Sequence, residues 1–205
     1  MENRNSDTEE QRSMFFHPYN ILLSLVLFSI TTLFLAFSAA YIYTRFEART
    51  PPIKLPIIFL FNTVILLASS VSMNWAKQSY KNDNTTTYQM ALVTTIVLSL
   101  IFMVAQFIGW RQLFGQEIFI NYSNTASYLY VISGLHFAHV VAGLPFLILF
   151  LVTAHRRMKE PVSVLVYFSD PEKLLKLRLL TVYWHFLDAL WIYLVLFFYI
   201  NYWIS

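Results

Sequence analysis

The 205-residue chain contains no Cys, few charged residues, and only four Gly and seven Pro. Without Cys it cannot form disulfides, thiolate zinc sites, iron–sulfur clusters or c-type haem attachments, so metal ligands would have to come from its five His residues and its carboxylates. Charged residues make up 12% of the sequence and hydrophobic residues 58%, whereas about a quarter of a soluble domain is charged. The composition therefore predicts that a lipid bilayer solvates most of the chain.

Five apolar segments of about 20 residues or more are each long enough to cross the hydrocarbon core of a membrane. They cover residues 19–43, 55–75, 88–110, 128–154 and 179–203. Only Pro145 lies inside a segment, where it should bend the helix mildly. We therefore predict an all-α integral membrane protein with a domain of five transmembrane helices over residues 15–205. Residues 1–14 are too acidic for the basic start of a signal peptide, and we expect them to be a disordered polar tail.

The distribution of Lys and Arg predicts how these helices are oriented in the membrane. Ten of these residues fall in the tail, the second loop and the fourth loop, and four fall on the opposite side. Because basic loops are retained in the cytoplasm, we expect a cytoplasmic N-terminus and an external C-terminus. The basic residues lie between apolar segments rather than on one face, so the net charge of +3 does not indicate a nucleic-acid partner.

A cluster of cations is expected where the fourth and fifth spans meet at the cytoplasmic surface. Asp170-Pro171-Glu172 combines an N-cap residue, a first-turn Pro and an acidic residue, so the last helix should begin before its membrane span. Five basic residues then gather at one seam and suit a phospholipid headgroup such as that of cardiolipin: Arg156, Arg157, Lys173, Lys176 and Arg178. An ordinary topology-setting role explains the same charges equally well.

Four titratable side chains lie well inside the fourth and fifth segments. Asp188 is the only acidic residue at such a depth, where a charge is costly unless it is paired or neutralised. His185 precedes it by three residues on the same face, and His136 and His139 are likewise three apart on the fourth segment. His139 should lie at a depth similar to that of Asp188, so we expect it to meet Asp188 or His185. Gly143 should let a neighbouring helix approach closely.

Three roles are open to this polar cluster: a hydrogen-bonded lock between helices, a proton relay, or a metal site. A protease-type metal site would need a Glu beside the His pair, whereas only apolar residues separate His136 from His139. A haem would need small neighbours, and Trp184, Phe186 and Trp191 crowd the place. Other polar residues of the spans are interpreted as helix–helix hydrogen bonds rather than as a transport path: Ser69, Ser70, Ser72, Asn74 and Gln106.

Four motifs carry a likeness to a known family. They are YWHFLDALW at residues 183–191, GLHFAHVVAG at residues 134–143, NTVILLASS at residues 62–70 and AAY at residues 39–41. Together they resemble subunit III of the haem-copper respiratory oxidases, in particular the short five-helix form found in bacteria. The likeness covers essentially residues 15–205. Two positions depart from the family: Ile30 replaces a Glu on which a proton-linked role would rest, and Phe137 replaces the Gly between the paired His residues.

This resemblance implies an accessory, non-catalytic subunit of a proton-pumping terminal oxidase in aerobic electron transport. It implies no cofactor in this chain, haem and copper in the partner subunits, contact with catalytic subunit I and other oxidase subunits, and bound phospholipid. The implied location is the inner membrane of a bacterium. An accessory subunit of a nitric-oxide reductase and a small transporter subunit are the alternatives. A transporter should show inverted repeats or helices broken near the midplane, which this sequence lacks.

Overall fold

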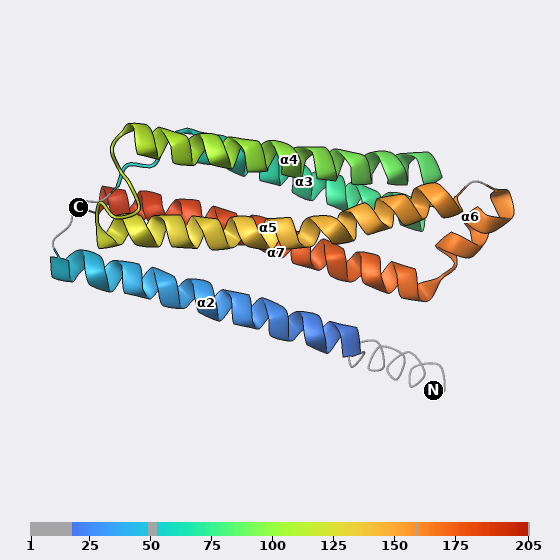
Figure 1. Cartoon of the computed structure of the whole chain (residues 1–205). Coiled ribbons are helices and arrows are strands. Elements are labelled where there is room, and N and C mark those ends of the chain that lie inside the picture. Colours follow the sequence, from blue (N-terminus) through green and yellow to red (C-terminus); the bar gives the residue numbers. More distant parts are fainter. Residues whose placement is uncertain (1–17, 49–52, 159, 205) are drawn as a thin grey trace.

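The computed structural model describes residues 18–48, 53–158 and 160–204. The predicted tail over residues 1–14 lies outside this part of the chain. The described residues form helices and no strand: α2 (Pro18–Ala48), α3 (Ile58–Lys81), α4 (Thr85–Gly115), α5 (Asn124–Arg157), α6 (Pro161–Phe168) and α7 (Pro171–Trp203). All of these except α6 are long and apolar enough to cross a membrane, which confirms the predicted all-α membrane fold (Figure 1).

The last span begins as predicted, with its N-terminal turns ahead of the apolar segment. The Asp170 carboxylate accepts hydrogen bonds from the backbone N–H groups of Glu172 and Lys173, at 3.0 and 3.4 Å, and Pro171 occupies the first turn of α7. The short helix α6 was not predicted, because its eight residues cannot cross a membrane and lie between two charged stretches.

Helices α3 and α4 form a tight antiparallel hairpin. The turn between them contains Asp83 in a left-handed conformation, with φ of 51°, which reverses the chain at once after α3. Asn84 then caps α4, since its side chain accepts a hydrogen bond from the backbone N–H of Thr87 at 3.1 Å. The turn and the cap together allow α4 to begin directly after α3.

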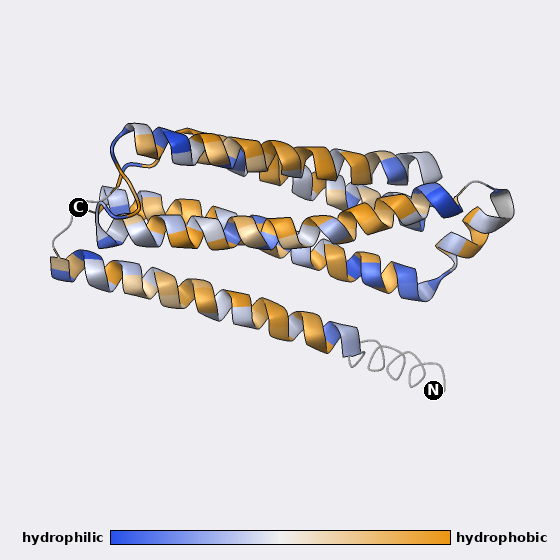
Figure 2. Ribbon diagram, viewed as in Figure 1, coloured by the Kyte–Doolittle hydropathy of each residue, from blue (hydrophilic) through white to orange (hydrophobic). Residues whose placement is uncertain are grey.

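The remaining spans pack around this hairpin. Helix α7 packs against both α3 and α5, α5 also packs against α4, and α2 runs along α5 and α7 (Figure 1). Helix α5 continues through Pro145 as one helix. Figure 2 shows hydrophobic residues along the helices and hydrophilic residues gathering toward their ends. Many large apolar side chains face outward, such as Phe28 and Val64, so lipid or partner proteins must cover them.

Candidate functional site

The signature segment of α7 is hydrogen-bonded to α3. The indole Nε1 of Trp184 donates to Ser69 Oγ at 3.0 Å. His185 lies between two α3 side chains, with its Nδ1 2.5 Å from Ser70 Oγ and its Nε2 3.0 Å from Asn74 Oδ1. Residues 70 and 74 are one turn apart on the same face of α3, and residue 69 lies about 100° around the helix from residue 70. The α7 motif and the Ser pair of α3 therefore form one interhelical contact.

Asp188 joins the same contact through Ser70, whose hydroxyl interacts with its carboxyl group. The Asp188 side chain is buried, and its Oδ2 atom has no partner among the described residues. Two arrangements of the protons satisfy the hydrogen bonds that link Asp188, Ser70 and His185. Either a neutral carboxylic acid donates to Ser70 and Ser70 donates to His185, or a protonated His185 donates to Ser70 and Ser70 donates to the carboxylate. Each has zero net charge, which a low-dielectric environment favours.

The two His residues of α5 have different partners. His136 is fully buried; its Nε2 donates to the backbone carbonyl of Leu187 at 3.1 Å, and its ring lies 4.9 Å from that of Trp191. His139 donates from Nδ1 to the carbonyl of Leu135 at 2.7 Å, one turn earlier on its own helix. Both nitrogens must be the protonated ones, because a carbonyl can only accept.

The predicted cluster is therefore divided between two interfaces. His185 and Asp188 bind α3, whereas His136 lies between α4, α5 and α7, where its ring meets Phe102 edge to face. The expected meeting of His139 with Asp188 or His185 is replaced by a bond within α5, and α7 reaches His139 only at its backbone, through the Tyr183 hydroxyl at 2.9 Å.

The α3 partners of α7 were recognised in the sequence only as general helix–helix hydrogen bonds. That interpretation is confirmed for the polar residues of α3 and α4. Ser72 Oγ donates to the carbonyl of Ala91 at 2.9 Å, and Asn62 donates to Gln106 Oε1 at 3.0 Å inside the bundle. The polar spacing in residues 62–74 was the signal that one face of α3 is an interface.

Gly143 allows α7 to pack closely against α5, as predicted. A Cβ atom added at this position would lie 2.8 Å from Cζ3 of Trp184 and 3.0 Å from Cε1 of Tyr183. By contrast, nothing lies within 4 Å of a Cβ added at Gly134 on the same helix. The small residue is therefore required where the two aromatic rings of α7 cross α5.

Phe137, which according to the resemblance replaces a Gly, packs against α4. Its ring lies 5.1 Å from that of Phe107 and 5.4 Å from that of Trp110. The indole of Trp110 also donates to Ser133 Oγ at 3.1 Å, one turn from Phe137 on α5. The larger side chain is thus accommodated by an aromatic group between α4 and α5.

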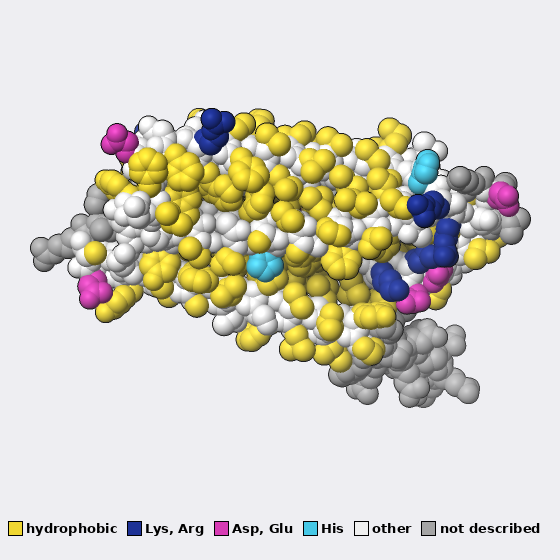
Figure 3. Space-filling model, in the orientation of Figure 1, with side chains coloured by type: hydrophobic (Ala, Val, Ile, Leu, Met, Phe, Trp, Pro, Cys, Tyr) yellow, Lys and Arg dark blue, Asp and Glu magenta, His cyan; other side chains and the backbone are white. Residues whose placement is uncertain are grey.

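The predicted cations lie at the end of the bundle where α5 ends and α7 begins, and Figure 3 shows Lys and Arg side chains gathered at one end of a largely hydrophobic face. A cavity of about 510 Å³ there is lined by Arg156, Arg157, Glu160, Ser163, Val166, Tyr167 and Lys173. A second, of about 320 Å³, extends along apolar α5 side chains and is lined by Phe146, Leu149, Phe150, Thr153, Arg157, Tyr167, Lys173 and Lys176. Arg178 is exposed and lines neither cavity.

Acidic neighbours partly neutralise this seam. Lys173 forms a salt bridge of 3.0 Å with Asp170 and lies over the ring of Tyr167, and Lys176 forms one of 2.8 Å with Glu172. The hydrogen bond from Lys173 lowers the pKa of Asp170, so this carboxylate is ionised at neutral pH. The cations free of a carboxylate partner at the cavities are thus Arg156 and Arg157, within the part of the chain that the structure describes.

The positions of the described His, Asp and Glu side chains give little support for a metal site. Within residues 18–48, 53–158 and 160–204, no three His, Asp or Glu side chains are close enough together to hold a metal ion. The buried His136 also has aromatic neighbours on two helices, Phe102 and Trp191, so its ring has little room for a bulky group.

Comparison with known sequences identifies a family and several proteins to which this chain is similar. The family model described as Cytochrome c oxidase subunit III matches residues 17–205. The chain is 31% identical over 143 residues to cytochrome c oxidase subunit 3 of Papio hamadryas and 32% identical to that of Rattus norvegicus, each match covering 70% of this chain and 49% of the relative. The protein of Spodoptera frugiperda is 29% identical, with 70% and 86% covered. The chain thus spans about half the length of the first two relatives.

Proposed function

Because this chain belongs to the cytochrome c oxidase subunit III family, we propose that it is an accessory, non-catalytic subunit of a haem-copper terminal oxidase. The match over residues 17–205, which includes all five spans, is the observation that carries this proposal. Among the described residues, no group of three or more His, Asp or Glu side chains could hold a metal ion, which supports placing the redox metals in other subunits. The partners we propose are catalytic subunit I and the other subunits of the oxidase.

Purification through a tag on this chain tests the proposal directly. We expect the detergent-solubilised chain to bring a catalytic subunit with it, and the optical spectrum to show a- or o-type haem. A spectrum with b-type haem alone would favour an accessory subunit of a nitric-oxide reductase instead. Recovery of the chain with no haem protein at all would contradict both assignments and leave a transporter subunit as the alternative.

We propose that the chain contributes to the durability of the oxidase rather than to electron transfer. Deleting the chain should leave the haem spectrum of the remaining complex nearly intact, while activity decays sooner during turnover. Its large outward apolar faces support this role, because removing them exposes apolar surface on the partner as well. Immediate loss of the haem would argue that the chain is needed for metal insertion.

The orientation of the chain follows from its charges. The described basic residues are more numerous at the end where α3 ends and α7 begins than at the opposite end, so we propose that this end is cytoplasmic, with the C-terminus outside. We propose a bacterial cell membrane as the location. A C-terminal alkaline phosphatase fusion should be active, and an inactive phosphatase with a working cytoplasmic reporter at the same end would reverse the assignment.

We further propose that the seam between α5 and α7 holds a phospholipid. Arg156 and Arg157 would bind its phosphate, and the apolar part of the smaller cavity, along Phe146 and Phe150, would take a tail. Replacing both Arg residues by Gln should lower the phospholipid that mass spectrometry finds in the purified complex. The control replaces Lys77 and Lys81, which lie at the same end of the bundle and line neither cavity. If the amount of bound phospholipid is unchanged in the Arg variant, these charges serve only to set the topology.

A further inference from the structure

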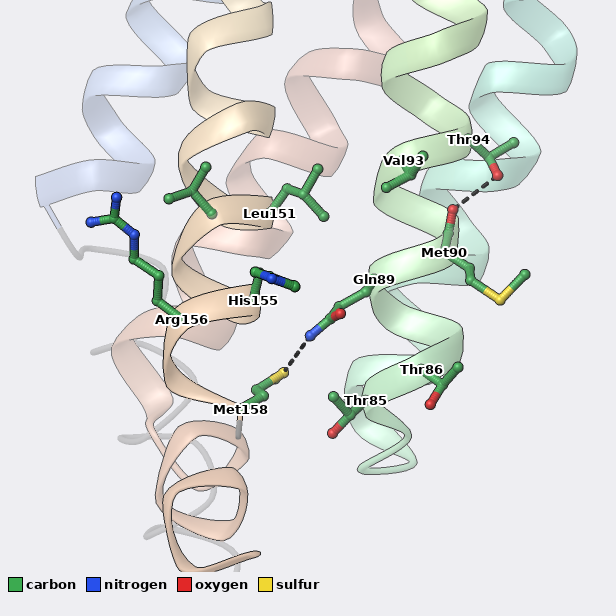
Figure 4. Close-up of a pocket in the computed structure, with 11 residues that line it drawn as sticks. Thr85, Thr86, Gln89, Met90, Val93, Thr94, Leu151, His155, Arg156 and Met158 are labelled. Carbon is green, nitrogen blue, oxygen red and sulfur yellow. Dashed lines mark hydrogen bonds between the residues drawn. The ribbon is translucent and has the colours of Figure 1, made fainter. Parts of the chain in front are cut away.

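A groove separates the start of α4 from the end of α5. It encloses about 900 Å³, a volume in the range of ligand sites, roughly 300–1,000 Å³. Figure 4 looks onto it: α4 and α5 form its two sides, and the side chains of Gln89 on α4 and His155 on α5 extend toward the space between the helices. The groove therefore presents a polar group from each of its two walls.

The space between these two side chains contains no fixed charge. Arg156 is the only Lys, Arg, Asp or Glu residue that lines the groove. Its guanidinium lies on the opposite side of α5 from Gln89, as Figure 4 shows. A buried phosphate or carboxylate group requires a cation or several charge-assisted hydrogen bonds. The mouth of the groove thus favours an uncharged occupant that forms hydrogen bonds.

Both polar side chains can donate and accept hydrogen bonds. The Gln89 amide has an N–H donor and a carbonyl acceptor, and the neutral imidazole of His155 has one donor nitrogen and one acceptor nitrogen. The amide nitrogen of Gln89 makes only a long contact of 4.0 Å with the Met158 sulfur, and His155 forms no hydrogen bond with another described residue. These groups can therefore bind either an accepting oxygen or a donating hydroxyl.

The deeper walls of the groove are apolar. Val93 and Leu151 line it one helical turn further into the membrane than the two polar side chains, on α4 and α5 respectively. Met90 and Met158 also contribute to the lining, and Met side chains adapt to irregular shapes and pack favourably against aromatic rings. A molecule with a flat polar ring and an apolar tail matches this order of surfaces.

We infer that the groove binds a prenylated quinone of the membrane, with its ring between Gln89 and His155 and the start of its tail along Val93 and Leu151. Such a ring carries oxygen atoms at two opposite positions, so it can reach both walls at once. Its oxygens accept from N–H groups in the quinone form, and its hydroxyls donate to the amide oxygen and the imidazole nitrogen in the quinol form. The inference concerns binding alone, goes beyond the proposed oxidase function and does not depend on it.

Filling the groove tests the tail site. We would purify the intact complex with Val93→Phe and Val152→Phe, illuminate it with an azido derivative of a short-chain ubiquinone, and measure the label on the groove peptides of this chain. The control carries Val97→Phe and Val131→Phe on the same helices, outside the groove. The pairs are matched in exposure, 44% and 38% against 47% and 38%. The groove variant should lose most of the label that the control retains; equal labelling would overturn the inference.

Substitution of Gln89 tests the ring site. Gln89→Leu should weaken binding of both redox forms about fivefold, which corresponds to about 1 kcal/mol, the contribution of one neutral hydrogen bond. Gln89→Glu should weaken binding of the quinone but retain the quinol, because an ionised carboxylate only accepts. Gln78→Leu, exposed on α3 and outside the groove, is the control and should change neither affinity. Unchanged affinities in both Gln89 variants, measured by competition with the photolabel, would refute the ring position.

Other occupants are distinct outcomes. Because the chain has no Cys, Val93→Cys provides its only thiol, to which a benzophenone crosslinker can be attached in native membranes. Illumination should add the mass of the membrane quinone to the chain. Addition of a phospholipid would show that ordinary bilayer lipid fills the groove, and a crosslink to a polypeptide would show that another subunit covers it; either result would contradict the inference. Haem that co-purifies with the same chain tests the proposed oxidase function separately.

Discussion

Replacing Gly143 by Ala should destabilise the contact between α5 and α7. The new Cβ would lie 2.8 Å from Cζ3 of Trp184, whereas ordinary contacts begin at 3.4 Å, so the ring must move by about 0.6 Å. Trp184 is fully buried, and its Nε1 donates to Ser69, so the movement strains the bond to α3 as well. A single methyl group on α5 thus disturbs two interfaces of α7.

The magnitude follows from opposing effects. Overpacking costs about 1–3 kcal/mol, and a weakened buried hydrogen bond adds up to about 1 kcal/mol. Ala gains about 0.8–1.0 kcal/mol over Gly in helix propensity, so the net loss should be about 0–3 kcal/mol. Gly134→Ala gains the same propensity with nothing within 4 Å of the new atom, so it should be neutral or stabilising by up to about 1 kcal/mol.

The two variants can be compared by the temperature at which this subunit leaves the purified complex, followed by size-exclusion chromatography. The propensity gain is common to both variants, so they should differ by about 1–4 kcal/mol. With about 2–4 °C per kcal/mol for a chain of this size, Gly143→Ala should dissociate roughly 2–16 °C below Gly134→Ala. Equal dissociation temperatures would refute the close packing of Trp184 on α5. A lower temperature for Gly134→Ala would show instead that a partner covers that side of the helix.

Three further outcomes follow from the hydrogen bonds of α7. Asp188→Asn should be tolerated, because the amide can donate to Ser70, whereas Asp188→Leu should weaken assembly by about 1–3 kcal/mol; a normal yield with a large loss of turnover in the Asn variant would favour a proton relay. Trp184→Phe should cost about 1 kcal/mol more than Trp191→Phe in dissociation experiments, because Trp191 Nε1 has no hydrogen-bond partner among the described residues, and equal losses would contradict this. Asp170→Ala should speed amide hydrogen exchange in the first turn of α7, whereas Asp170→Asn, which keeps a capping oxygen, should not; equal exchange in both would show that the cap does not hold that turn.

Much of the fold could be predicted from sequence because membrane spans depend on length and polarity alone. The start of α7 was also predictable, since Asp170 and Pro171 act locally. The hydrogen-bond partner of His139 could not be predicted. Depth along a helix was estimated at 1.5 Å per residue, but the direction of a side chain depends on the rotation of the helix, and residues three apart differ by about 60°. His136 and His139 consequently have different surroundings.

The position of Ile30 bears on what such a subunit can contribute. Its side chain is buried at 5% exposure in the same apolar cluster as Phe34 on α2, so this place in the first span carries no titratable group. His136 and His139 each donate to a backbone carbonyl, and Asp188 and His185 are joined through Ser70. These described His and Asp side chains are thus all hydrogen-bonded, and those of His136, His185 and Asp188 join neighbouring helices, whereas that of His139 bonds within α5. What remains available for interaction is the outer surface, where Arg156 and Arg157 line a cavity at the end of the bundle.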